Sequence, residues 1–381
     1  RSRFLYTGAL LGTHQLSDNF KLDWQGGFSL TNQREPDYRQ MSLRAGNVVV
    51  AAPAPEINGR FFSNLDEYNI TGQLNTEYKF ESGIALRAGG FTEVRRRDFA
   101  ARIFSFIAPL AGNPQDPAVA PDAPGIGPRN IFAPENFRAD GYLVTELARP
   151  TDTYEASNDL VAGYLAVNLP LLENRLNIYT GVRAEYNRYV LRGREEGNTT
   201  IRDLADFPQT LLLPSINITY KTGENSQVRG SYGTTVNRPE LRELAPFNFY
   251  NFVWNRGEGG NPNLRTAIIH NFDLNFQYFP SLNEVLTVGV FYKNFIDPIE
   301  QISLPTSANA VFFNFANASS AYVAGAELEL RKNLDFIGPF FKNFGALFNA
   351  SWIASDVNIG AERAALTGQT LNRPLQGQSP Y

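Results

Sequence analysis

The sequence predicts an all-β protein built as an antiparallel transmembrane β-barrel. Three observations predict it: apolar and polar residues alternate over long segments, short and long connections alternate between them, and the polar sides carry few charges. Residues 270–279 show the first clearly, because Phe272, Leu274, Phe276 and Tyr278 alternate with Asn, Asp and Gln side chains. A strand sends successive side chains to opposite faces, so this segment has one apolar and one polar face.

The same alternation recurs in about twelve segments, which we predict to be strands. Their approximate ranges are 3–15, 20–33, 65–81, 83–97, 155–170, 175–192, 209–221, 226–238, 266–280, 284–299, 319–332 and 344–357. Helical periodicity is nearly absent, and Glu362–Thr367 is the weak helical candidate. Most segments exceed the ~5–6 residues usual in globular strands.

The connections fall into two sets. Tight turns rich in Asn, Asp, Gly and Ser are predicted at 16–19, 81–83, 171–174, 222–225 and 281–284. Long irregular loops are predicted at 34–64, 98–154, 193–208, 239–265, 300–318 and from 358 onwards; the second includes the Pro- and Gly-rich segment 113–128. The apolar segment 333–343 stands where a tight turn is expected but is longer. Short turns at one end and long loops at the other indicate periplasmic and extracellular sides of a barrel.

Lipid is the predicted environment of the apolar faces. Membrane strands need ~9–11 residues, which these segments reach. Aromatic residues lie near many segment ends, as in interfacial girdles. Examples are Phe4, Tyr6, Phe20, Trp24, Tyr78, Phe80, Tyr186, Tyr189, Tyr278, Phe279, Tyr292 and Phe295. Phe272 to Tyr278 would then face lipid, and Asn271 to Gln277 a wet lumen. The alternative is a soluble β-sandwich or large barrel with an aromatic-rich core. No apolar run reaches the ~20 residues of a transmembrane helix.

Composition excludes several functions. Net charge is −4 and the pI about 5.5, which disfavours nucleic-acid binding. Cys is absent and His14 and His270 are the two histidines, so we expect no metal site and no cofactor. No catalytic constellation stands out, and Glu327 and Glu329 suit a lumen wall better than catalysis, so we expect no enzyme.

Two ordered motifs resemble TonB-dependent receptors. The stretch SYGTTVNRPELRELAPFNFYNF at 231–252 contains Arg238, Pro239 and Glu240, and GNPNLRTAIIHNFDLNFQYFP at 260–280 contains an N-P-x-L segment and an N-x-D-L strand. FYKNFIDPIEQ at 291–301 and RPLQGQSPY at 373–381 are also similar to family segments.

This resemblance implies a multi-pass protein of the outer membrane of a Gram-negative bacterium, which imports a scarce nutrient with TonB-coupled energy. Residues 1–381 would be a partial barrel, about twelve strands of a probable ~22, with a plug domain not present in this chain. A complete twelve-stranded barrel is the alternative, because even strand numbers from 8 upward occur. The implied partners are the TonB complex through that plug, lipid and lipopolysaccharide, and an unidentified imported ligand; a surface lipoprotein over the loops is left open. A passive porin or accessory barrel of a larger assembly, and a soluble all-β carbohydrate-binding protein, are the alternatives.

Ligand-binding candidates lie at the long-loop end. Arg95 and Arg97 belong to an arginine triplet entering the longest loop, where guanidinium groups suit an anionic ligand or lipopolysaccharide phosphate. The loop at 247–261 combines aromatic faces with Asn and Arg, which suit sugars, peptides or chelates. Its candidates are Tyr250, Trp254, Arg256 and Asn261. The alternative for the arginines is an ordinary solvated rim. The alternative for the loop is that its own aromatic residues pack together and hold it on the rim. The aromatic segment 310–320 is consistent with both interpretations of the loop.

Overall fold

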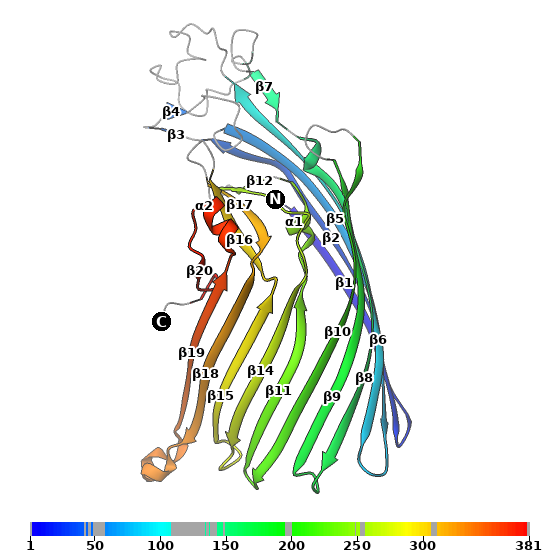
Figure 1. Ribbon diagram of the computed structural model, residues 1–381, viewed down its shortest axis with the longest axis vertical. Coiled ribbons are helices and arrows are strands. Elements are labelled where there is room, and N and C mark those ends of the chain that lie inside the picture. Colours follow the sequence, from blue (N-terminus) through cyan, green and yellow to red (C-terminus); the bar gives the residue numbers. More distant parts are fainter. Residues whose placement is uncertain are drawn as a thin grey trace.

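One antiparallel sheet dominates the computed structural model (Figure 1). The structure describes residues 2–41, 43–44, 47–48, 58–107, 134, 137, 143–147, 149–194, 200–247, 249–251, 256–305 and 311–378. The long strands are β1 (Ser2–Ser17), β2 (Phe20–Met41), β5 (Asn58–Lys79), β6 (Ala85–Ile107), β8 (Thr153–Leu171), β9 (Leu176–Gly193), β10 (Arg202–Gly223), β11 (Ser226–Asn237), β14 (Ala267–Tyr278), β15 (Val285–Ile296), β18 (Ser320–Asn333) and β19 (Gly345–Asn358). The twelve predicted strands are therefore confirmed, and each pairs with its sequence neighbour in this set.

Several strands extend beyond their predicted ends on the long-loop side. β5 starts at Asn58, β6 runs to Ile107, and β10 starts at Arg202, so parts of the predicted loops 34–64, 98–154 and 193–208 are strand. The ladder between β5 and β6 continues without a register shift to the pair Gly59 and Ser105. These extensions were missed because apolar residues fall on both faces there, as the adjacent pairs Phe61–Phe62, Ile103–Phe104 and Leu204–Ala205 show, which removes the alternation signal. The Pro- and Gly-rich segment 113–128 lies outside the described residues.

The tight turns are confirmed, and the segment 333–343 is resolved into two short 3-10 helices. These are η3 (Asp335–Ile337) and η4 (Pro339–Asn343), joined at Gly338. Phe340 stacks on Phe344 with ring centroids 5.5 Å apart. An exposed aromatic knob thus replaces a turn between β18 and β19, at the lower left of Figure 1.

The alternation separates a convex apolar face from a concave polar one. Phe272 and Leu274 are 46% and 53% exposed, whereas their neighbours Asn271 and Asn275 are partly buried. Register carries the apolar face across the sheet, because Phe272 is opposite Tyr232 and Tyr292. The predicted sidedness of this strand is confirmed.

Two of the aromatics assigned to girdles are corrected. Tyr189 and Phe295 pack into buried clusters instead, because their positions in β9 and β15 alternate with the outward-facing Tyr186 and Tyr292. Proximity to a strand end did not distinguish the two faces.

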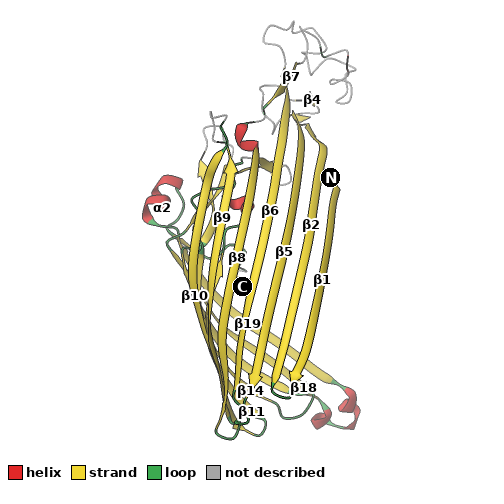
Figure 2. Cartoon of the chain, turned by 90° about the vertical axis from the view of Figure 1, so that its right-hand side faces the viewer, coloured by secondary structure: helices red, strands yellow, loops and turns green. Residues whose placement is uncertain are grey.

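The segment after β11, residues 238–247, folds back into the concave side (Figures 1 and 2) and is called the docked segment below. It contains α1 (Leu241–Leu244), and Leu241, Leu244 and Phe247 are at most 2% exposed. The Phe247 ring packs 5.0 Å from that of Phe99 on β6. Burying each such side chain contributes about 1.5–3 kcal/mol, so the sheet wall holds this segment by apolar contact. The predicted loop 239–265 is thus largely a docked element.

A small second sheet continues this inner layer. It pairs β12 (Phe249–Asn251), β13 (Arg256–Glu258), β17 (Val311–Asn317) and β16 (Ile299–Pro305), so the predicted loop 300–318 is partly strand. The short strands β3 (Leu43–Arg44) and β4 (Asn47–Val48) pair with each other, and β7 (Leu143–Glu146) pairs with β6.

Near the end of the chain, α2 (Ala361–Thr367) confirms the weak helical candidate, and β20 (Asn372–Arg373) pairs with β19. No helix in the described part of the chain is both long and apolar enough to cross a membrane. Among the described residues the main sheet stays open, with β1 paired to β2 alone and β19 to β18 and β20.

Candidate ligand-binding wall

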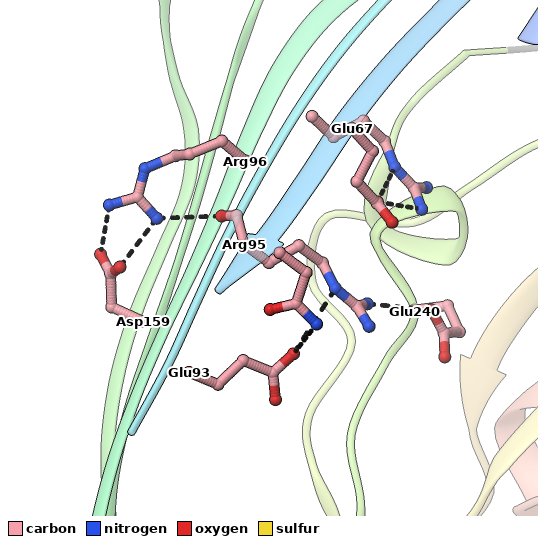
Figure 3. A network of polar contacts seen from close by, with 8 residues as sticks. Glu67, Glu93, Arg95, Arg96, Asp159 and Glu240 are labelled. Carbon is pink, nitrogen blue, oxygen red and sulfur yellow. Dashed lines mark hydrogen bonds and ion pairs between the residues drawn. The ribbon is translucent and has the colours of Figure 1, made fainter. Parts of the chain in front are cut away.

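The arginine triplet divides between the two faces of the sheet. Arg95 points to the concave side, toward Glu240, and Arg96 points to the convex side (Figure 3). Arg97 lies two positions after Arg95 and pairs with Glu67, so it shares the concave side with Arg95. Strand alternation is the cause, because all three residues lie within β6. The triplet is therefore not one cation cluster but two sites on opposite surfaces.

Arg97 is held by an acidic neighbour on the concave wall. Its Nη2 lies 2.5 Å from Oε2 of Glu67, and its Nε donates to the same oxygen at 2.6 Å. Only 14% of the Arg97 side chain is exposed. These contacts join β5 to β6 beneath the docked segment.

Arg95 has looser contacts. Its Nε lies 3.7 Å from Glu93 and its Nη1 lies 3.8 Å from Glu240 of the docked segment, both beyond hydrogen-bond length (Figure 3). Glu93 accepts a shorter bond of 3.0 Å from the Asn69 amide. The buried Nε of Arg95 has no hydrogen-bond partner in the structure. Arg95 therefore retains donor capacity.

A second ion cluster links the docked segment to β9. Glu185 is 7% exposed and accepts a 2.6 Å bond from Nε of Arg183 and a further bond from Nη2 of Arg238. Arg238 belongs to the Arg-Pro-Glu motif, which the sequence singled out, but its contact with Glu185 was not foreseen. The partner could have been sought on the polar face of the predicted strand 175–192.

A polar hollow of about 250 Å³ lies between these two clusters. Its lining consists of Glu93, Arg95, Asn158, Leu160, Asn187, Tyr189, Asn237, Arg238, Pro239 and Glu240. Asn158 and Asn187 are 6% and 2% exposed, and each has a buried Oδ1 atom without a hydrogen-bond partner. The Nε atoms of Arg95 and Arg238 are likewise unpartnered.

These four atoms give the hollow unsatisfied donors and acceptors, which are costly when buried. A polar ligand or water that bonds to both kinds of group would relieve that cost. Arg95 and Arg238 are balanced by Glu93 and Glu240 in the lining, so the hollow suits hydroxyl, amide or carboxylate groups rather than a highly charged anion.

Burial shifts the pKa values of ionisable groups in the docked segment and in a short helix before β8. Burial lowers the pKa of Arg242 to about 10 and raises the pKa of Glu243. In η2 (Pro150–Asp152), burial raises the pKa of Asp152 to about 6, although its Oδ2 accepts a 2.7 Å bond from the Arg149 backbone. Desolvation disfavours the charged form in all three cases.

The loop candidates lie in the inner layer. Arg256 donates to Glu258 at 2.7 Å and stacks 4.2 Å from the ring centroid of Phe313. Asn261 donates to the backbone oxygen of Phe315 at 3.0 Å. Through these contacts Arg256 links β13 to Phe313 of β17, and Asn261 links the following loop to Phe315 of the same strand.

Of the two aromatic candidates, Tyr250 lies in β12, where it pairs with Gly257. Trp254 lies outside the described residues. Phe247, at the start of the same loop, is a buried brace, as one of the two interpretations expected.

Comparison with known proteins agrees with this architecture. A family model described as "TonB dependent receptor-like, beta-barrel" matches residues 2–377. The fold resembles the unliganded ferric citrate transporter FecA, with a TM-score of 0.60, 11% identity, and coverage of 94% of this chain and 43% of that one. It also resembles the siderophore receptor PiuA from Acinetobacter baumannii, with a TM-score of 0.57, 14% identity, and coverage of 94% and 47%.

The copper transporter OprC gives a TM-score of 0.55 at 13% identity, covering 93% of this chain and 46% of that one. The chain therefore spans less than half the length of these three structures. No curated protein matches the sequence.

Proposed function

Because the chain belongs to the TonB-dependent receptor-like β-barrel family, we propose that it forms part of an outer-membrane receptor importing a scarce nutrient with energy delivered through TonB. Family membership places the protein in the outer membrane of a Gram-negative bacterium. It also favours the membrane interpretation of the convex face over the soluble alternative. Members of this family are transporters rather than enzymes.

The observation that carries the proposal is the two-faced sheet with a segment docked inside its curve. The convex face is apolar, while the concave face holds ion pairs, buried amides and an unsatisfied polar hollow. A surface of that second kind suits a wet lumen through which a polar ligand passes.

The open sheet supports a larger barrel. Hydrocarbon tolerates no unpaired sheet edge, so the edges of β1 and β19 must be paired in the membrane. We propose that residues 1–381 are a partial barrel, completed by further strands to about 22, and that a plug domain in its lumen contacts TonB.

The proposed ligand contacts are Arg95 and Arg238 with the amides of Asn158 and Asn187. Tyr250, Trp254, Arg256 and Asn261 are proposed as further contacts from the loop, while Arg97 is proposed to hold the wall through Glu67. The names of FecA, PiuA and OprC refer to ferric citrate, a siderophore and copper, which supports a metal complex as the first class of nutrient to test.

The test is growth and radiolabelled iron uptake with a panel of ferric chelates, comparing the native strain with strains lacking this gene or TonB. We expect at least one chelate whose uptake requires both this gene and TonB. Uptake that needs this gene but persists without TonB would instead support the passive-porin alternative. Uptake of every chelate without this gene would reject iron chelates as the substrate class.

Arg238→Gln and Arg95→Gln test the hollow. We expect both to weaken binding of the transported chelate about tenfold, since each removes a charge-assisted bond of about 1.5–3 kcal/mol. Arg229→Gln, on β11 and outside the hollow lining, is the matched control.

A further inference from the structure

The aromatic knob, residues 335–344, is an exposed apolar surface with no role in the function proposed above. It consists of η3 and η4 and joins β18 to β19. The side chains of Phe336, Ile337, Phe340 and Phe344 are each at least 50% exposed, and that of Phe340 is 76% exposed. A contiguous exposed apolar patch of this kind is typical of a surface that meets a membrane or another molecule.

The knob continues the lipid-facing side of the sheet. Phe344 has extended backbone, and its carbonyl oxygen accepts a 2.9 Å bond from the Leu334 amide, so the ladder of β18 and β19 reaches it. Strand alternation therefore puts Phe344 on the same face as Phe348, four residues further along the chain. Phe348 belongs to the convex face, because it is opposite Leu330 in the register that leads across β15 to Tyr278.

Ring contacts hold the rest of η4 to this side. The Phe340 ring stacks on that of Phe344 with centroids 5.5 Å apart. The Phe341 ring meets Phe344 at 64°, with centroids 5.8 Å apart. The three rings thus form one surface that extends the apolar convex face past the ends of the strands.

The base of the knob is fixed to the neighbouring turn between β14 and β15. Glu284 at the end of that turn accepts a 2.6 Å bond from Nζ of Lys332 and a 3.1 Å bond from the Asn333 backbone amide. Nζ of Lys332 also lies 5.5 Å from the ring centroid of Phe336. The sheet therefore positions the knob, and Figure 1 shows it at the level of the other tight turns.

This level is the periplasmic boundary of the membrane, because short turns face the periplasm in outer-membrane barrels. Segments that combine exposed aromatic residues with lysine lie in the plane of such a boundary, with their apolar side chains about 5–10 Å deep. Lys342 follows the stacked rings, is exposed and has no ion pair among the described residues. Its long side chain can reach lipid phosphates while the rings stay among acyl chains.

We propose that the aromatic knob is a membrane anchor lying in the interfacial layer of the periplasmic leaflet. Phe340 and Phe344 contact the upper acyl chains of phospholipids there, and Lys342 contacts their phosphates. The knob differs from the aromatic residues at the strand ends, which reach the boundary as single side chains, because it presents a whole helical segment to the lipid. The proposal rests on the membrane orientation given above and does not depend on which nutrient is imported.

Depth-dependent fluorescence quenching tests it. Residues 1–381 contain no cysteine, so Phe340→Cys introduces one labelling site, once any cysteine elsewhere in the full-length protein is replaced by serine. The label is nitrobenzoxadiazole, and the vesicles contain phosphatidylcholine and phosphatidylglycerol. Glu224→Cys, in the polar turn between β10 and β11, is the matched control. Compared with that control, we expect about threefold stronger quenching by nitroxides on the upper acyl chain and about threefold weaker quenching by iodide present on both sides.

Equal quenching at the two sites would overturn the proposal, since the knob would then lie in water. Protection from iodide without quenching by lipid nitroxides would also overturn it, because protein rather than lipid would then cover the knob. Heat-modifiable migration of each variant on gels verifies that its barrel is folded. If Phe340→Cys misfolds, Phe340→Trp keeps an aromatic ring at this position. Its added fluorescence, read as the difference from the native protein, should be quenched by brominated lipids, and absence of that quenching would contradict the anchor.

Discussion

At the scale of single residues, the concave wall depends on a few buried charges whose partners come from distant segments. Glu185 lies on β9, and Arg238 reaches it from the docked segment. Removing one member of a buried ion pair leaves the other charged and uncompensated, which usually costs more than the pair contributes.

We therefore expect Glu185→Gln to lower the free energy of unfolding by about 3 kcal/mol, because Arg183 and Arg238 lose their carboxylate. Urea titration of the protein in lipid bilayers, followed by tryptophan fluorescence, measures this change. Glu327→Gln is the control, since Glu327 also lines the concave side but has no ion pair among the described residues. Equal effects of the two substitutions would show that the Glu185 cluster contributes nothing specific.

Asp152 gives a pH-dependent prediction. Its folded pKa, about 6, exceeds the unfolded value of about 3.8, so the folded state binds the proton more tightly. Its contribution to stability is complete below the unfolded pKa and is lost as pH rises through about 6. Between pH 5 and 7.5 we expect η2 to lose about 1.4 kcal/mol of local stability, measured by pH-corrected hydrogen exchange of its amides.

Asp152→Asn supplies the control for this prediction. The variant keeps an oxygen to accept the Arg149 backbone bond but cannot ionise, so its protection should not vary between the two pH values. The same pH dependence in both proteins would assign the effect to another group.

At the scale of elements, the docking of α1 distinguishes a wall-bound segment from a free loop. Leu244 is 1% exposed and belongs to the apolar cluster between the docked segment and the sheet. Leu244→Ala should weaken docking by about 2–4 kcal/mol through lost burial and the cavity left behind. We expect proteolysis near α1 to accelerate by more than tenfold when cleavage follows local opening.

The matched control is Leu366→Ala on α2, whose side chain is 72% exposed. It should leave the rate of cleavage near α1 unchanged. If Leu244→Ala also leaves that rate unchanged, the docked segment is held by its ion pairs rather than by its apolar contacts.

At the scale of the whole molecule, two adjacent substitutions on β14 test whether the convex face meets lipid. Leu274 and Asn275 are neighbours on β14 and point to opposite sides of the sheet. Leu274→Arg should destabilise the protein folded in bilayers by about 2–4 kcal/mol, because a charge on the lipid face must leave water. Asn275→Arg should cost distinctly less, since its side chain faces the lumen. Urea titration in vesicles measures both losses of stability. A larger loss for Asn275→Arg than for Leu274→Arg would show that the lipid and lumen faces are assigned the wrong way round.

The sequence by itself determined the repeated unit of this protein. Strict alternation in segments such as 270–279 fixed strand identity and sidedness, because the period of a strand is two and lipid demands a continuous apolar face. Turn chemistry fixed which strands are neighbours. The ordered motifs at 231–252 and 260–280 indicated the family. These are local properties, so no knowledge of distant contacts was needed.

Tertiary structure alone decided where the polar side chains meet. Alternation implied that Arg96 faces away from Arg95 and Arg97, yet only the folded chain brought Arg238 to Glu185 and placed Asn158 beside Asn187 around one hollow. Sequence could not supply these pairs, because they depend on how far each strand is shifted against the next and on a segment folding back into the curve. Register and docking are settled by packing across the whole sheet, and so the site, unlike the strands, belongs to the three-dimensional structure.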